Sequence, residues 1–577
     1  MIDHDVLIIG GGLAGTRAAV EVARTNPHLR IGLIAKTHPI RSHSVAAQGG
    51  IAATLKNADP KDSWEAHAFD TVKGADYLAD QDAVAILTQD APNVVIDLEH
   101  MGVLFSRRKD GRIAQRAFGG HSHNRTCYAA DKTGHAILHE LVNNLERYRV
   151  KLYDEWYVTQ LIFEDNQAKG VVAYRILDGS IEVFRAKAVM FATGGYGRVY
   201  NTTSNDYASC GDGLAMTVAV GLPVEDMEFV QFHPTGLYPV GVLISEAVRG
   251  EGAYLINALG DRFMADYAPS RMELAPRDIT SRAIGQEVRA RRGIHPVDGS
   301  AGGPVVYLDL RHLGREKIME RIPFCWEEAH VHLGIDAAVV PIPIRPTVHY
   351  SMGGIPVNLE GRVRRDGVTL TEGFFSAGET ACVSVHGANR LGSNSLLECV
   401  VFGKRTGFAM AQYVRDRSLP DLDPDVYIRS TEDQLQTLLD QPGEYRIQQI
   451  RQAYQDCMTE HCGVFRNETT METGLVKLKE IRSKAGRLCL DDKSRAWNSE
   501  LVEALELRSL MRVGEIILTS ALNRQESRGS HYREDFPDRN DQQFLKHTLA
   551  SYNPDTGVVL DYMPVTVNQF EPMERKY

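Results

Sequence analysis

The feature that most constrains the fold is a short apolar run at the N-terminus that leads directly into closely spaced glycines. Residues 5–9, DVLII, are typical of a central strand in a parallel sheet that is buried on both faces. Gly10, Gly12 and Gly15 follow with the spacing GxGxxG. In this spacing the first glycine permits a tight turn, the second lets the backbone approach a pyrophosphate, and the third allows the next helix to pack closely on the strand.

The residues after the glycines complete a unit of strand, helix and strand. A helix over residues 13–24 would direct its N-terminal amides at phosphate groups, and a second apolar run covers residues 31–35. NAD-binding units of this kind carry an acidic residue near the end of the second strand, where it binds the ribose. Ala35, Lys36 and Thr37 stand in that place, so the sequence favours FAD over NAD.

A second motif, RSHSVAAQGG, occupies residues 41–50. Its distance from the glycine fingerprint places His43 where the flavin ring of a bound FAD should lie. The two motifs together predict a flavoprotein.

Composition limits the other classes of function. A chain of 577 residues exceeds a single hydrophobic core, so we expect roughly two to four domains. The formal net charge is −11 and the lysines and arginines are dispersed, which gives no basic surface for nucleic acid.

The cysteines and the apolar runs limit metal and membrane binding. None of the eight cysteines forms a CxxC pair, so we expect reduced structural thiols and no iron–sulfur cluster or zinc site in this chain. No signal peptide is recognisable, and no apolar run approaches about 18 residues. If a membrane is involved, another subunit must provide the anchor.

The order of the apolar segments predicts an α/β fold. A Rossmann-like FAD-binding domain would be interrupted by an α+β capping domain and followed by a helical domain and a C-terminal region. Residues 188–195 predict a strand that returns to the flavin, and residues 373–379 predict a last strand that delivers Glu379 to a ribose. The tail from Asn523 is expected to be folded but irregular. The expected boundaries are 1–235 and 344–415 for the FAD-binding domain, 236–343 for the capping domain, 416–522 for the helical domain and 523–577 for the C-terminal region.

Further strings in the chain resemble the flavoprotein subunits of succinate dehydrogenase and quinol:fumarate reductase over essentially the full length. Besides residues 41–50, the matching strings are ATGG at 192–195, GDG at 211–213, EFVQFHPTG at 228–236, SEAVRGEG at 245–252, ELAPRD at 273–278, RPTVHYSMGGI at 345–355, HGANRLGSNSL at 386–396 and ESRGSH at 526–531. Nine strings in the same order are not a chance match.

The resemblance implies a covalent FAD, joined through His43 to the 8α carbon of the flavin. Such a flavin is a stronger oxidant, which suits removal of a hydride from an unactivated alkane. Asp212 is expected near the ribose or adenine, although it could instead be a helix N-cap. The residues expected to contact the cofactor are Gly10, Gly11, Gly12, Leu13, Ala14, Gly15, Lys36, Thr37, Ser42, His43, Ser44, Ala47, Gln48, Gly49, Gly50, Asp212, Glu379, Arg390, Ser395 and Leu396.

The resemblance also implies a site for a C4 dicarboxylate, which needs cationic or donor partners at both ends. Arg390 and His349 would bind one carboxylate, and His233 and Ser245 the other. Threonine is the commoner family residue at Ser245, but the hydroxyl is kept. Phe118 and Gly49 are expected near the substrate carbons, although Phe118 could equally be a simple core residue.

Proton transfer is assigned by the resemblance to Arg277, with a relay through Glu246 and Arg249; His233 is also counted among the catalytic residues. Arginine is a poor base in isolation because its pKa is very high, so its role must come from its position beside Glu246. The spacing of Glu246 and Arg249 would place both on one face of a helix.

Three functions are compared. The first is the catalytic subunit of a succinate:quinone oxidoreductase that works with an iron–sulfur subunit and a membrane anchor, peripheral on the cytoplasmic side. The second is L-aspartate oxidase, which His43 disfavours because that enzyme binds FAD non-covalently. The third is a non-catalytic flavin-binding module, which the retained substrate residues disfavour. Gln48 favours succinate oxidation, while the string RTCY at 125–128 looks closer to fumarate reductases and leaves the direction open.

Overall fold

A mixed sheet of eight strands is the centre of the computed structural model, which describes residues 1–295, 303–553 and 555–576. The strand that precedes the glycine fingerprint and the second apolar run lie side by side and parallel, as the sequence predicts. In spatial order the strands are β16 (Arg362–Arg364), β17 (Leu370–Ser376), β8 (Gln167–Arg175), β9 (Ile181–Phe191), β1 (Ile2–Ile9), β2 (Ile31–Ala35) and β6 (Lys151–Asp154), with β7 (Trp156–Glu164) paired to β8.

The parallel part of this sheet presents its carboxyl ends to one edge. β9 and β17 are parallel neighbours, so the predicted returning strand and the predicted last strand end together beside β1. Ligands of open α/β sheets bind outside the carboxyl ends of the strands. The register therefore directs the glycine fingerprint, the ATGG string and Glu379 toward one place.

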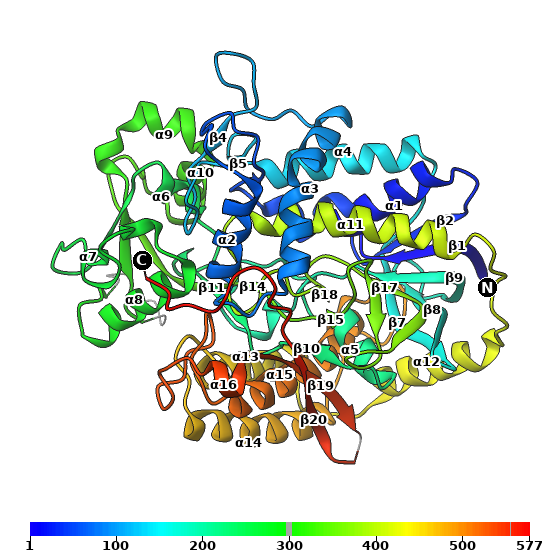
Figure 1. Cartoon of the computed structure of the whole chain (residues 1–577). Coiled ribbons are helices and arrows are strands. Elements are labelled where there is room, and N and C mark those ends of the chain that lie inside the picture. The colour runs from blue at the N-terminus through cyan, green and yellow to red at the C-terminus, as the bar shows by residue number, and fades with distance from the viewer. Residues whose placement is uncertain (296–302, 554, 577) are drawn as a thin grey trace.

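Helices from distant parts of the chain cover one face of the sheet (Figure 1). α1 packs on α11, which begins within the string HGANRLGSNSL, so the fingerprint helix and this string are neighbours. The helices on this side are α1 (Leu13–Thr25), α2 (Trp64–Gly74), α3 (Gln81–His100), α4 (Thr133–Arg147) and α11 (Asn394–Tyr413). The short strands β3 (Ile51–Ala52), β4 (Gln115–Arg116) and β5 (Thr126–Cys127) form a small sheet beside them.

A second sheet with its own hydrophobic core lies at the left of Figure 1. Its strands are β11 (Val230–Leu237), β14 (Ile342–Ser351), β13 (Val306–Asp309) and β12 (Tyr254–Ile256), and its helices are α6 (Glu246–Gly250), α7 (Met264–Tyr267), α8 (Arg277–Arg289), α9 (Arg315–Arg321) and α10 (Pro323–Leu333). β11 and β14 pair along their length, and their ends belong to different cores: Val230 and Val348 to the first, Leu237 and Ile344 to the second. This strand pair therefore connects the second sheet and its helices, called the inserted unit below, to the core of the main sheet.

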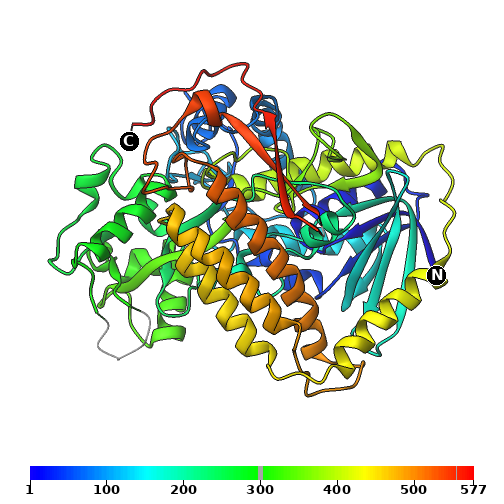
Figure 2. The same ribbon diagram turned by 90° about the horizontal axis from the view of Figure 1, so that it is seen from below.

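The stretch expected to be helical contains four helices, α12 (Pro424–Asp440), α13 (Ile447–His461), α14 (Glu468–Ala485) and α15 (Ser499–Asn523). α13, α14 and α15 pack side by side, as Figure 2 shows. α15 also packs on α5 (Asp212–Ala219), which brings the bundle to the main sheet. Within the described ranges, no helix combines the length and the apolarity needed to cross a bilayer.

The expectation of an irregular C-terminal region is wrong for residues 541–553 and 557–564. Residues after the short helix α16 (Asp541–Phe544) form a hairpin of β19 (Lys546–Asn553) and β20 (Gly557–Pro564). β19 also pairs with β10 (Val224–Glu225), more than 300 residues earlier in the chain. One of the two strands that pair with β19 is therefore far away in the chain, and the local sequence pattern does not reveal it. Two further short strands, β15 (Ile355–Pro356) and β18 (Ala381–Cys382), pair in parallel.

Candidate active site

A cavity of about 900 Å³ extends from the glycine fingerprint to the inserted unit. Every site residue predicted from the sequence lines this cavity, except Gly15 and Arg249. The lining residues come from more than ten separate segments, so only the tertiary structure brings them together. A cavity of this size accommodates a large elongated ligand together with a small one.

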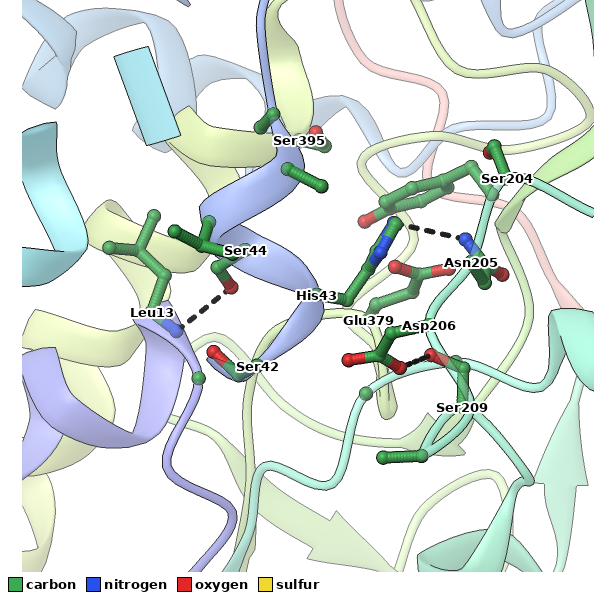
Figure 3. A pocket seen from close by; sticks show the side chains of 18 of the residues that line it. Leu13, Ser42, His43, Ser44, Ser204, Asn205, Asp206, Ser209, Glu379 and Ser395 are labelled. Atoms are coloured by element: carbon green, nitrogen blue, oxygen red, sulfur yellow. Dashed lines mark hydrogen bonds between the residues drawn. The ribbon is translucent and has the colours of Figure 1, made fainter. Parts of the chain in front are cut away.

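The fingerprint end fits a dinucleotide. Gly10 has a φ of +115°, and a Cβ at Gly15 would lie only 2.0 Å from the Gly10 carbonyl oxygen, so neither position accepts a side chain. The N-cap of α1 is Gly12, which has no side chain to cap the helix, and the amide of the first helical residue, Leu13, donates instead to Ser44 Oγ at 3.1 Å (Figure 3). The N-terminus of α1 and the motif with His43 therefore form adjoining parts of one wall, as an FAD that spans both requires.

Lys36 and Asp212 meet at the same end of the cavity. Lys36 Nζ lies 2.8 Å from the Asp212 carboxylate and 2.6 Å from that of Glu506 in the helical bundle, and Tyr157 donates to Asp212 at 2.9 Å. The N-cap of α5 is Gly211, with Asp212 as the first helical residue, so the expectation of Asp212 as an N-cap is wrong. The Asp212 side chain instead belongs to a partly buried ion-pair cluster on the cavity wall.

His43 projects into the cavity from a short 3₁₀ turn, opposite the loop that carries Asn205 (Figure 3). Asn205 Nδ2 donates to His43 Nε2 at 3.0 Å. Burial lowers the pKa of His43; Arg198 adds to this effect and Asp206 opposes it. The buried His43 Nδ1 and Ser42 Oγ find no hydrogen-bond partner within the part of the chain that the structure describes. Such unpartnered polar atoms beside a cavity fit a bound cofactor.

Glu379 lies on the cavity wall after the end of β17, where the sequence predicts it. Its Oε1 accepts a hydrogen bond from the Ser351 amide at 2.8 Å. Burial raises the pKa of Glu379 to about 8. A neutral carboxylic acid can donate as well as accept, which suits a contact with a ribose hydroxyl.

Arg390 and two histidines lie at the other end of the cavity. The Arg390 guanidinium stacks over the Tyr350 ring at 4.8 Å, and burial, together with the nearby Arg277, lowers the Arg390 pKa to about 9. The rings of His233 and His349 are 5.0 Å apart, and burial lowers the pKa of both well below the usual value. This end of the cavity therefore combines arginine charge with neutral imidazoles.

Each of these histidines has one ring nitrogen held by a hydroxyl. Ser204 Oγ lies 2.8 Å from His349 Nδ1, and Thr235 Oγ1 lies 3.2 Å from His233 Nδ1. His233 Nε2 is buried and has no hydrogen-bond partner among the described residues. This nitrogen is available for a ligand in the cavity.

Arg277 and Glu246 form a buried ion pair. Arg277 Nε donates to Glu246 Oε2 at 2.7 Å, and Arg277 Nη1 donates to Gln231 Oε1 at 2.9 Å. Arg249 lies behind Glu246 at 3.7 Å, on the same face of α6 as its spacing predicts. Burial would raise the pKa of Glu246, but Arg277 and Arg249 outweigh it and hold this pKa below its usual range. The carboxylate is ionised between two arginines.

Phe118 and Ser245 lie close to this ion pair in the cavity wall. Phe118 is 4% exposed, packs in the second core and also lines the cavity, so both expectations for it apply. A Cβ at Gly49 would lie 2.4 Å from Phe118 Cζ, which shows how closely the ring covers that backbone. Ser245 caps α6 by accepting from the Ala247 amide, and its hydroxyl hydrogen has no acceptor among the residues that the structure describes.

The sequence patterns did not identify several residues whose side chains contact the predicted site residues. Gln231, Ser204 and Asn205 contact Arg277, His349 and His43, respectively. Gln231 lies within the string EFVQFHPTG, so the sequence contained a signal that could have identified it as a site residue. Ser204 and Asn205 lie in a loop without a recognised motif, and no local signal connects them to partners about 150 residues away.

Comparisons with known proteins give several relatives that match nearly the whole chain. A family model described as an FAD binding domain matches residues 5–396, and one described as the fumarate reductase flavoprotein C-terminal region matches residues 451–577. A succinate dehydrogenase flavoprotein subunit of Rickettsia conorii is 44% identical, with 99% of this chain and 98% of the relative covered. A fumarate reductase flavoprotein subunit of Mycobacterium tuberculosis is 42% identical, with 100% and 99% covered. A solved E. coli quinol fumarate reductase variant is 39% identical, with a TM-score of 0.94 over 100% of this chain and 98% of that one.

Proposed function

The chain belongs to the family of succinate dehydrogenase and fumarate reductase flavoprotein subunits, and on that premise we propose how its cavity performs the chemistry of the family. It is an FAD-dependent oxidoreductase that acts on a CH–CH bond and interconverts succinate and fumarate. It is the catalytic flavoprotein subunit of a succinate:quinone oxidoreductase.

The substrate assignment depends mainly on the burial of Arg390 and on the charges around it. This guanidinium is 2% exposed and lines the cavity, yet no carboxylate among the described residues lies within ion-pair distance of it. A buried charge without a partner is costly, so the site is built to receive an anion. A dicarboxylate would place one carboxylate on Arg390 and His349 and the other on His233 and Ser245.

FAD supplies the group that exchanges a hydride with the substrate carbon. Arg277 would exchange the proton of the neighbouring carbon, because its guanidinium reaches the cavity and donates to Glu246 at the same time. Glu246 and Arg249 would pass that proton onward along the buried ion pair. Phe118 and Gly49 would close the cavity over the substrate carbons and exclude water.

We also propose that His43 carries the FAD covalently. Its ring lines the cavity between the fingerprint wall and the substrate end, and its lowered pKa leaves the imidazole neutral and nucleophilic near pH 7. A covalent flavin is a stronger oxidant, which favours succinate oxidation. The rest of the cofactor would be held by the fingerprint, the motif at 41–50, Lys36, Thr37, Asp212, Glu379, Ser395 and Leu396.

The assembly and the direction of turnover are part of the same proposal. The solved relatives include a quinol–fumarate reductase with menaquinol, so we propose an iron–sulfur subunit and a membrane anchor as partners, with the chain peripheral on the cytoplasmic side. Gln48 supports the dehydrogenase direction, because a neutral amide beside the flavin disfavours reduction less than a carboxylate would. Its amide donates to the Leu243 carbonyl at 3.1 Å, which fixes it in the wall.

One preparation tests the function and the linkage together. The purified protein should reduce a dye with succinate and oxidise a reduced dye with fumarate, and L-aspartate should not replace succinate. After acid precipitation the flavin should stay in the pellet for the unaltered chain and appear in the supernatant for His43→Ser. Turnover of L-aspartate with released flavin would instead support the aspartate oxidase alternative.

A further inference from the structure

The amide of Asn205 connects the two histidines of the flavin end and the substrate end. Asn205 is 3% exposed, and its Nδ2 lies 3.0 Å from His43 Nε2 and 2.9 Å from the His349 carbonyl oxygen. Figure 3 shows the amide facing the edge of the His43 ring. The two hydrogens of Nδ2 are therefore directed at two acceptors.

The His349 carbonyl determines which way this amide points. A carbonyl oxygen only accepts, so the atom of Asn205 beside it must be the donor Nδ2 and not Oδ1. The same nitrogen then donates to His43 Nε2, which must present its lone pair. In the neutral imidazole the ring proton consequently lies on Nδ1.

We propose that Asn205 is a positioning residue for cofactor attachment: it selects the His43 tautomer with a free lone pair on Nε2 and holds the ring edge toward the cavity. This inference rests on the proposed covalent linkage at His43. The family resemblance and the sequence motifs assign no such role to Asn205.

The tautomer matters because only a nitrogen with a lone pair can form the new bond. In the attachment step His43 Nε2 gains a bond to the 8α carbon, and the Nδ1 proton and one 8α proton are released. The two electrons pass to the flavin ring, and fumarate, the oxidant of the proposed reaction, removes them together with the two protons as succinate. After attachment Nε2 has no lone pair to accept a hydrogen bond, so the bond to carbon replaces its hydrogen bond from Asn205. The hydrogen bond from Asn205 to the His349 carbonyl can remain.

The state of His43 before attachment supports this order of events. In the selected tautomer Nδ1 carries a proton, but the buried Nδ1 has no acceptor among the described residues. A buried donor without a partner is unfavourable. Attachment removes that proton and turns Nδ1 into an acceptor, so the ligand-free arrangement is poised to react.

The test compares Asn205→Asp and Asn205→Ala in the full chain, expressed in cells that attach flavin to the unaltered protein. The aspartate keeps the shape but replaces the donor on His43 Nε2 by an acceptor, which favours a proton on that nitrogen. We expect the acid-stable share of the bound flavin to fall at least about tenfold in Asn205→Asp and less in Asn205→Ala. Asn201→Ala is the matched control, because its amide lies in the same loop and binds Asp456 instead of a histidine.

The ratio of acid-stable to total flavin separates positioning from a structural role. If Asn205 only held the loop, both variants would lose total flavin and the acid-stable share of what remained would be unchanged, which would overturn the proposal. Normal attachment in Asn205→Asp would overturn it as well, while leaving the linkage at His43 intact. Absence of acid-stable flavin in the unaltered chain would contradict the linkage itself and the role of Asn205 with it.

Discussion

Arg277 donates from Nε to Glu246 Oε2 at 2.7 Å, and both side chains are almost completely excluded from solvent. The pair lies at the end of the cavity that we assign to the substrate. Arg249 holds the far side of the same carboxylate. A chain of donor and acceptor groups thus runs from the cavity into the protein, which is what transfer of a proton from a weakly acidic C–H group requires.

Replacing Arg277 by lysine should abolish most turnover while FAD stays bound. An ammonium group cannot reproduce the fork that reaches Glu246 and Gln231 together, so the proton path is interrupted. We expect kcat to fall by about 10²- to 10⁴-fold. Succinate-dependent dye reduction measures this, with total flavin content as the control. Near-normal turnover would remove Arg277 from the mechanism.

Replacing Arg390 by glutamine should mainly weaken substrate binding and the transition state together. Removing one partner of a buried charge pair costs about 2–5 kcal/mol, so kcat/KM for succinate should fall by at least about 30-fold. Arg390→Lys keeps the charge but not the planar fork and should be intermediate. Steady-state kinetics in both directions tests the order of the variants; equal kcat/KM in all three proteins would contradict the proposed carboxylate site.

Gly49→Ala should disturb the substrate end through Phe118. The new methyl group would lie 2.4 Å from Phe118 Cζ, so the ring must move. We expect a higher KM for succinate in Gly49→Ala, measured per bound FAD because Gly49 also belongs to the motif that would hold the cofactor. Phe118→Leu relieves the overlap, so the double variant should recover part of the loss, with a coupling of about 1 kcal/mol or more in kcat/KM. Strict additivity would show that the two residues do not interact in solution.

His547 should stabilise the fold in a pH-dependent way. It is buried against Asp226 at 2.7 Å and Glu225 at 3.4 Å. Burial alone would lower the pKa of His547, but these carboxylates raise it well above the usual value. Because the folded pKa is above the unfolded one, the stabilisation is complete below about pH 6.5 and is lost as the pH rises through the folded pKa.

His547→Gln should therefore lower the thermal unfolding midpoint more at pH 6 than at pH 9. Leaving buried carboxylates without their cation costs about 3 kcal/mol at the lower pH. Differential scanning calorimetry at both pH values checks the sign. His28→Gln is a control, because His28 is exposed and lies outside this cluster. A larger loss at pH 9 would contradict the assignment of a protonated His547.

Local sequence patterns were sufficient to predict the strand and helix whose backbone would bind the cofactor. The apolar run before Gly10 and the helix after it follow from periodicity and from the absence of side chains at Gly10 and Gly15, and the structure places both elements where expected. The C-terminal hairpin was not predicted, because one of the two strands that pair with β19 lies far away in the chain.

The sequence alone predicted FAD binding from the glycine fingerprint, and its resemblance to known flavoprotein subunits placed the chain with the succinate dehydrogenases and fumarate reductases. Only the tertiary structure decided which side chains face one another in the cavity. Asn205 reaches His43 across 162 positions, and Gln231 reaches Arg277 across 46. Such contacts depend on the crossing of separate strands and loops, and no spacing along the chain records the distance between atoms that folding brings together.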